Sequence, residues 1–257
     1  MSDIDESKMP LLEHLIELRR RLLWSCGALG IAFCVCLYFA EPIFGFLVQP
    51  LLHAGQGKLI YTDIFEAFFV NLKVAFFAAL MIAFPVIVTQ MWRFVAPGLY
   101  TNEKAALRPF LLLTPVLFIA GAALAYYVAM PIALKYLLTG FTGNVGGVER
   151  EALPAIGNYL SFVTKFLFGF GVAFLLPVLL ILLERAGIVT RQQLQKGRRY
   201  AIVGVVAIAA VLTPPDIVSQ LLLAVPLVFL YEMAIIAIWF TEKRRKAKVE
   251  DPVELNE

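Results

Sequence analysis

Long apolar runs separated by short polar segments form the main pattern of this chain. An apolar helix of about 20 residues crosses the hydrocarbon core of a bilayer, so each long run is a candidate membrane span. The pattern predicts helices at about residues 22–39, 63–92, 109–128, 159–183, 200–212 and 217–240. We therefore expect an all-α, polytopic membrane protein whose six transmembrane helices form one membrane domain over residues 1–257.

The fifth run, residues 200–212, is shorter than the others. A helix rises ~1.5 Å per residue, so about a dozen residues reach roughly 18 Å and fall short of a ~30 Å hydrocarbon core. This helix either thins the bilayer locally or does not cross it.

The segments around the first two runs carry further local signals. Residues 11–23 have leucines at helical spacing, which predicts an amphipathic helix along the membrane surface ahead of the first span. The stretch from Thr62 to Glu66 has the form of a capping box, so the second span should begin there. Residues 41–61 and 130–158 are expected to be loops.

Four of the predicted spans contain a proline, at Pro85, Pro115, Pro177 and Pro226. Each proline removes a backbone hydrogen bond and bends its helix, so we expect a curved bundle. Gly169 and Gly171 in the fourth run predict close helix packing by small residues.

The basic residues decide the expected orientation, because cytoplasmic loops carry an excess of Lys and Arg. The loops on one side of the membrane hold only Lys58, Lys135 and Arg150. The two termini and the loops on the other side hold all the remaining Lys and Arg residues outside the spans. Both termini are therefore expected to be cytoplasmic, as an N-terminal segment, residues 1–21, and a C-terminal tail, residues 243–257. An even number of spans agrees with this arrangement.

The composition supports a membrane protein and excludes other classes. The chain is 61% hydrophobic and 16% charged, whereas soluble domains are nearer 25% charged. Nucleic-acid binding is not expected, because the basic residues are spread over short loops and not gathered on one face. Cys26, Cys34 and Cys36 lie in the first apolar run without a metal-binding spacing, so we expect buried, inert thiols.

Motifs for chemistry are absent from the sequence. There is no Ser-His-Asp set, no zinc-ligand spacing and no phosphate-binding loop, and His14 and His53 are expected on opposite membrane surfaces. We therefore expect no catalytic residue, no metal and no cofactor, and no enzyme. A secondary transporter or a passive assembly scaffold stays as an alternative, although a transporter usually has ionisable groups near the middle of its spans.

Recognition at the cytoplasmic surface is the remaining possibility, and two carboxylates are suited to it. Glu17 precedes the first span, and Glu103 ends a loop that Pro97 and Gly98 make rigid. A carboxylate best recognises a guanidinium, whose planar fork allows two parallel hydrogen bonds. The alternative is that each glutamate forms an ion pair with a basic neighbour in its own segment, Glu17 with Arg20 or Arg21 and Glu103 with Lys104 or Arg108.

Three separated motifs resemble the TatC family of the twin-arginine protein translocase. They are residues 14–22 (HLIELRRRL), 90–103 (QMWRFVAPGLYTNE) and 212–220 (LTPPDIVSQ). The resemblance covers essentially the whole chain, in the same order. It implies a receptor subunit for signal peptides that carry an Arg-Arg pair on folded cargo, working with the TatA and TatB subunits and driven by the proton-motive force.

The resemblance also implies roles for particular residues and a location. Glu17 and Glu103 would recognise the arginines, with Arg19, Phe94 and Pro97 shaping the surface around them. Thr213 and Gln220 would form a polar site where TatA and TatB dock, and Tyr126 and Asp216 match functional positions near the outer surface. The chain would lie in the bacterial cytoplasmic (inner) membrane, as a homo-oligomer within the complex and without a cofactor.

One position departs from the family pattern. Many members carry an acid in the fourth helix, two residues before its proline, and this chain has Leu175 there, ahead of Pro177. A proton or partner contact through that acid is therefore not expected here, and Lys165 is not an obvious substitute.

Overall fold

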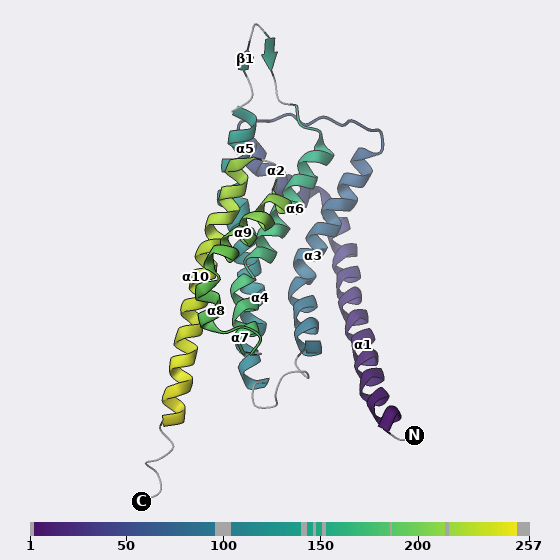
Figure 1. Cartoon of the computed structure of the whole chain (residues 1–257). Helices are drawn as coiled ribbons and strands as arrows, with labels where there is room; N and C mark the ends of the chain where they lie inside the picture. The colour runs from purple at the N-terminus through teal and green to yellow at the C-terminus, as the bar shows by residue number, and fades with distance from the viewer. Residues whose placement is uncertain are drawn as a thin grey trace, which may run out of the picture. The chain divides into compact units, whose positions relative to one another are not determined.

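The computed structural model describes residues 3–95, 104–139, 143–145, 148–150, 153–185, 187–213 and 216–250 (Figure 1). These residues are almost entirely helical, which confirms the predicted all-α class. The elements in chain order are α1 (Asp3–Tyr38), α2 (Ala40–His53), α3 (Glu66–Val95), α4 (Lys104–Leu124), a π-helical turn η3 (Ala125–Ala129), α5 (Met130–Thr139), strands β1 (Gly143–Val145) and β2 (Val148–Arg150), α6 (Ile156–Ala173), α7 (Leu176–Arg185), α8 (Arg191–Lys196), α9 (Arg198–Leu212) and α10 (Ile217–Glu250).

Five helical segments of the described chain are long and apolar enough to cross a membrane. They are His14–Tyr38, Glu66–Phe94, Leu112–Leu138, Ile156–Arg185 and Ile217–Lys243. The predicted fifth helix also forms, as α9, but it has only 15 residues. The protein is therefore a polytopic membrane protein.

The contacts divide the chain into two compact units. Unit 1 comprises Met1–Val116 and Leu138–Thr164, and unit 2 comprises Leu117–Leu137 and Lys165–Glu257.

In unit 1, α1 and α3 lie side by side and run in opposite directions (Figure 1). Their shared core contains Cys36, Ala75 and Ala79, packed against larger side chains such as Phe33. Small residues in both helices let the two backbones approach closely, which is how helices associate where water provides no driving force. This packing fixes the relative position of every side chain on the facing surfaces of α1 and α3.

In unit 2, glycines bring α4 and α6 together. A Cβ atom on Gly121 would lie 2.7 Å from the backbone oxygen of Phe170, and one on Gly171 would lie 2.6 Å from the ring of Phe118. Both positions therefore require glycine for this packing. The prediction of close packing at Gly169 and Gly171 is confirmed, since Gly169 also packs against Leu212.

The N-terminal expectations need correction. The amphipathic segment 11–23 and the first span are one uninterrupted helix, α1, because no proline or turn signal separates them. Of the three cysteines only Cys36 is buried, whereas Cys26 and Cys34 are exposed on α1.

The loop expected at residues 41–61 is also partly wrong, because α2 occupies most of it. Pro42 lies in the first turn of α2, where the N–H groups have no intrahelical partner and proline costs little. The helix ends at His53, and Gly55, two residues further on, has a φ of 90° that suits glycine. The N–H groups of Gly55 and Gln56 then donate to the carbonyls of Leu52 and Leu51, which is a Schellman motif.

The third span extends past its expected end at residue 128, through η3 and α5 to Thr139. The π turn ends two residues before Pro131, whose ring excludes the carbonyl four residues back, within the π turn, from the regular helical ladder. Strands β1 and β2 then pair antiparallel, with Gly143 opposite Arg150. The expected loop at 130–158 therefore contains a helix and a hairpin.

The remaining spans differ from the prediction at their ends. The expected break near Pro177 is confirmed, since α6 ends at Ala173 and α7 begins at Leu176. By contrast, Pro85 and Pro226 lie inside the continuous helices α3 and α10. A short helix, α8, lies in the expected loop after the fourth span and begins with a capping box between Thr190 and Gln193. Helix α10 continues to Glu250, well past the expected end at residue 240.

Candidate functional site

The candidate site is formed in unit 1 by one face of α1 and the last turns of α3. Glu17, Arg20, Arg21 and Trp24 have the spacing i, i+3, i+4, i+7, which places them on one face of α1. The antiparallel packing brings the C-terminal end of α3 beside this face. The two helices together therefore determine which side chains meet.

Glu17 holds a guanidinium from its own helix. Nε of Arg21 donates to Oε1 of Glu17 at 3.0 Å, and Nη2 of Arg21 donates to the same oxygen. Nη1 of Arg21 also donates to Oε1 of Gln90 on α3, at 3.4 Å. The alternative expected for Glu17, an ion pair with Arg21 of its own segment, is thus present. The same guanidinium also links α1 to α3 through Gln90.

An aromatic contact joins α1 and α3 near the end of α3. The rings of His14 and Phe94 are stacked, with centroids 4.2 Å apart and an interplanar angle of 15°. Nδ1 of His14 lies 4.0 Å from Oε2 of Glu17. The ring of Phe94 thus contacts the residue that lies beside the carboxylate of Glu17, and its role in shaping the receptor surface stays a prediction.

A groove of about 520 Å³ lies between these side chains. Its lining residues are Glu17, Arg20, Arg21, Trp24, Gln90 and Arg93. Its volume is in the range of ligand-binding sites, ~300–1,000 Å³.

Sequence reasoning found only part of this lining. It assigned Glu17 but gave no site role to Gln90 or Arg93, although their i, i+3 spacing places both on one face of α3. Arg19, which was assigned, is exposed and does not line the groove. Pro97 and Glu103 lie outside the described residues, so their roles stay predictions.

The expected polar site of unit 2 lies where α9 ends and α10 begins. Oγ1 of Thr213 is buried and donates to the carbonyl of Ala209 at 2.8 Å. Nε2 of Gln220 donates to the carbonyl of Val206 on α9 at 3.2 Å. Both residues thus form a hydrogen bond with α9. Thr213 does so at the C-terminal end of α9, and Gln220 does so from α10.

Asp216 has a structural role at the same junction. Its Oδ2 accepts a hydrogen bond from the backbone N–H of Ser219 at 2.7 Å, which caps the N-terminus of α10. Oδ1 of Asp216 and Oγ of Ser219 are buried and have no partner among the described residues. Tyr126, the remaining assigned residue, is buried in the π turn and packs edge-on against Tyr127, with centroids 4.9 Å apart.

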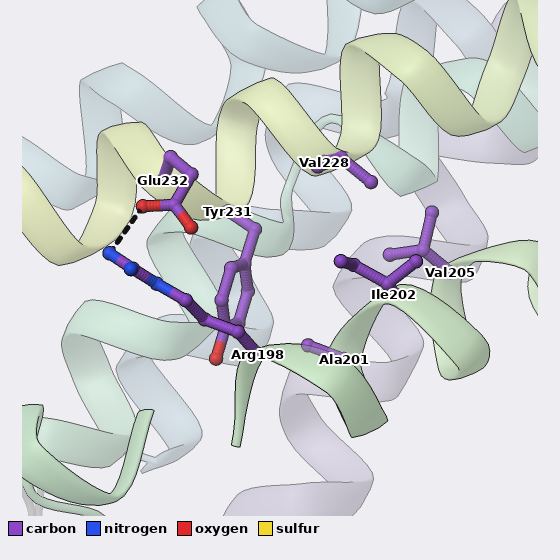
Figure 2. Close-up of a pocket in the computed structure, with 7 residues that line it drawn as sticks. All are labelled: Arg198, Ala201, Ile202, Val205, Val228, Tyr231 and Glu232. Carbon is purple, nitrogen blue, oxygen red and sulfur yellow. Dashed lines mark hydrogen bonds and ion pairs between the residues drawn. The ribbon is translucent and has the colours of Figure 1, made fainter. Parts of the chain in front are cut away.

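A second hollow of the described structure is in unit 2, between α9 and α10 (Figure 2). Arg198 and Glu232 form an ion pair of 2.9 Å at its edge, and Ile202, Val205 and Val228 form its apolar wall. Its volume of about 50 Å³ is too small for a small-molecule ligand. The ion pair and the hydrogen bond from Tyr231 to the carbonyl of Leu194, 2.7 Å, instead fasten α8 and α9 to α10.

The described residues contain no group of His, Cys, Asp and Glu side chains that could hold a metal ion. The chemistry that unit 1 offers is therefore ionic and hydrogen-bonding: a carboxylate, an amide and several guanidiniums on rigid helices.

Comparison with known proteins agrees with this architecture. Residues 13–226 match the family model described as Sec-independent protein translocase protein (TatC). The chain belongs to the TatC family. It is 49% identical over 232 residues to the Sec-independent protein translocase protein TatC of Magnetococcus marinus, which covers 90% of this chain and 84% of the relative. The TatC protein of Escherichia coli K12 is 39% identical over 232 residues, 90% of this chain and 88% of the relative.

A solved structure shows the same fold. The crystal structure of the twin-arginine translocase receptor TatC in DDM superposes with a TM-score of 0.76 at 40% identity, covering 87% of this chain and 98% of that one. A second crystal structure of the receptor gives 0.73 at 38% identity, covering 87% and 96%. The chain is thus a membrane-embedded subunit of a protein translocase, which is a transport component and not an enzyme.

Proposed function

We propose that this chain binds signal peptides that carry an Arg-Arg pair, and that Glu17 and Glu103 each bind one guanidinium. With the TatA and TatB subunits, it would then move folded cargo across the bacterial inner membrane by using the proton-motive force. The similar solved structures are described as twin-arginine translocase receptors, which supports this proposal.

One observation carries the proposal: the carboxylate of Glu17 already binds a guanidinium, that of Arg21, at 3.0 Å. Gln90 supports the same guanidinium from α3. A peptide arginine that entered the groove could therefore replace Arg21 at the same oxygens. The carboxylate sits on a packed helix and needs little rearrangement, which limits the entropy lost on binding.

The proposal extends to the other parts of the complex that the family resemblance implies. TatA and TatB dock near Thr213 and Gln220, and copies of the chain assemble within the complex. Arg19, Phe94 and Pro97 shape the receptor surface, and Tyr126 and Asp216 act near the opposite side of the membrane. Both termini face the cytoplasm, because the loops on that side hold most of the basic residues.

The test is binding of an Arg-Arg signal peptide and its Lys-Lys version to the purified protein in detergent. We expect the wild type to prefer Arg-Arg by on the order of tenfold, since an ammonium cannot form the paired hydrogen bonds of a guanidinium. The preference should disappear in the double variant Glu17→Ala, Glu103→Ala.

The matched control is Glu232→Ala, which removes another exposed carboxylate from an ion pair with an arginine. It should bind both peptides as the wild type does. Equal binding of both peptides by the wild type and the double variant would refute the proposal. In that case the purified protein should be tested for uptake of small solutes, which a secondary transporter would show and a scaffold would not.

A further inference from the structure

The groove in unit 1 is lined by more positive than negative side chains, which is not expected of a site that binds only cations. Three guanidiniums, those of Arg20, Arg21 and Arg93, line it together with one carboxylate, that of Glu17. The carboxylate is engaged by Arg21. Arg20 and Arg93 form no hydrogen bond or ion pair with any described side chain, so the described lining of the groove carries an excess of positive charge.

The surroundings of the groove place it at the surface of the bilayer. Arg20 lies near the start of the apolar segment His14–Tyr38, and Arg93 lies near the end of Glu66–Phe94. The side chain of Trp24 is 64% exposed, and its neighbours Leu22 and Leu23 are 60% and 61% exposed. Tryptophan is favoured at the boundary between headgroups and hydrocarbon, and exposed leucines favour acyl chains.

We propose that this groove binds the phosphate of an anionic phospholipid. The guanidiniums of Arg20 and Arg93 donate to the phosphate oxygens, Trp24 lies against the glycerol region, and the acyl chains lie along the apolar part of α1 beyond Trp24. Guanidiniums bind phosphate through paired, charge-assisted hydrogen bonds, which makes phosphate the natural counter-ion here. This inference does not depend on Arg-Arg recognition.

The bound lipid would also make peptide binding possible at this site. Two peptide arginines that approached Arg20, Arg21 and Arg93 would meet repulsion between like charges. A lipid phosphate between the two sets of guanidiniums removes much of that repulsion.

The test uses Trp24 as a probe for its own lipid neighbours. Trp92 and Trp239 are replaced by Phe, and the protein is placed in nanodiscs that mix ordinary phosphatidylcholine with brominated phosphatidylglycerol or with brominated phosphatidylcholine. Quenching of Trp24 emission then gives the preference for the anionic lipid. We expect a clear preference, which Arg20→Gln with Arg93→Gln reduces on the order of 30-fold, because each basic residue near an anionic surface contributes about fivefold.

Two further variants make the result specific. Arg20→Lys with Arg93→Lys keeps the charges and should retain most of the preference, which separates loss of charge from damage to the fold. Arg199→Gln removes an arginine that stacks on Tyr200 in unit 2 and should change nothing. Equal quenching by both lipids in the Trp24-only protein, or a preference that survives the double Gln substitution, would overturn the proposal. Loss of the preference on adding inorganic phosphate at the concentration of the lipid phosphate would overturn the assignment to a lipid.

Discussion

The carboxylate of Glu66, the first residue of α3, accepts a hydrogen bond from the backbone N–H of Gly157 in α6, with 2.7 Å between Oε1 and the nitrogen. Its other oxygen accepts from the backbone N–H groups of Thr62 and Asp63, which confirms the capping box expected there. One side chain thus satisfies orphan donors before α3 and at the start of α6. The backbone bonds of Ile60 with Pro154 and Ile156 fasten the same two segments.

The first prediction concerns this contact. A Cβ atom on Gly157 would lie 2.6 Å from Oε1 of Glu66, so Gly157→Ala displaces the carboxylate from its donors. We expect Gly157→Ala and Glu66→Ala each to lower the stability of the protein, because the backbone N–H groups at the two helix starts lose their acceptor. Thermal unfolding of the purified protein in detergent measures this loss.

The matched control for the glycine is Gly204→Ala in α9, where a Cβ atom would meet nothing within 4 Å. Alanine favours a helix over glycine, so this control should keep or raise the unfolding temperature. Equal stability of Gly157→Ala and Gly204→Ala would show that the Glu66 contact contributes little.

The second prediction concerns Arg21. Its guanidinium occupies Glu17, so Arg21→Gln frees the carboxylate and removes one positive charge from the groove. We expect the affinity for an Arg-Arg peptide to rise up to about fivefold, which is the range of partly exposed ion pairs. Titration of the peptide into wild-type and variant protein gives the ratio.

Arg199→Gln serves as the charge-matched control, because Arg199 lies on α9 and does not line the groove. If Arg21→Gln instead weakened peptide binding while Arg199→Gln did not, Arg21 would be holding Glu17 in its binding position, and the exchange mechanism would be wrong.

The third prediction concerns Asp216, whose carboxylate caps α10. Asp216→Ala removes the acceptor for the N–H of Ser219 and should cost about 1 kcal/mol of stability. Asp216→Asn keeps an acceptor oxygen and should unfold close to the wild-type temperature. The unfolding temperatures of both variants, together with export of a folded cargo in cells, separate capping from charge.

Export that fails in Asp216→Asn, with stability retained, would assign Asp216 a role that depends on its negative charge. If both variants were equally unstable, the cap would not explain the position, and the buried Oδ1, which has no partner among the described residues, would be the group to study next.

Local sequence signals correctly predicted the structural features that depend on residues close together in the sequence. The capping box at Glu66, the break before Pro177 and the shortness of α9 all depend on residues within one turn or one run, and all are present. The expected loops at 41–61 and 130–158 were partly wrong, because α2 contains Pro42 and α5 contains Pro131. One lies in a first turn and the other follows a π turn, and neither position stops a helix.

The sequence by itself determined a helical membrane protein, the approximate spans, and Glu17 as a carboxylate on a helix rich in arginine, because hydropathy and helical spacing are properties of neighbouring residues. Only the tertiary structure decided that Gln90 meets the guanidinium of Arg21 across 69 positions of sequence, and that Arg93 joins the same groove. That outcome depends on how closely α1 and α3 approach through Cys36, Ala75 and Ala79. Packing of this kind depends on the surfaces of both helices together, so the sequence of one helix alone does not determine it.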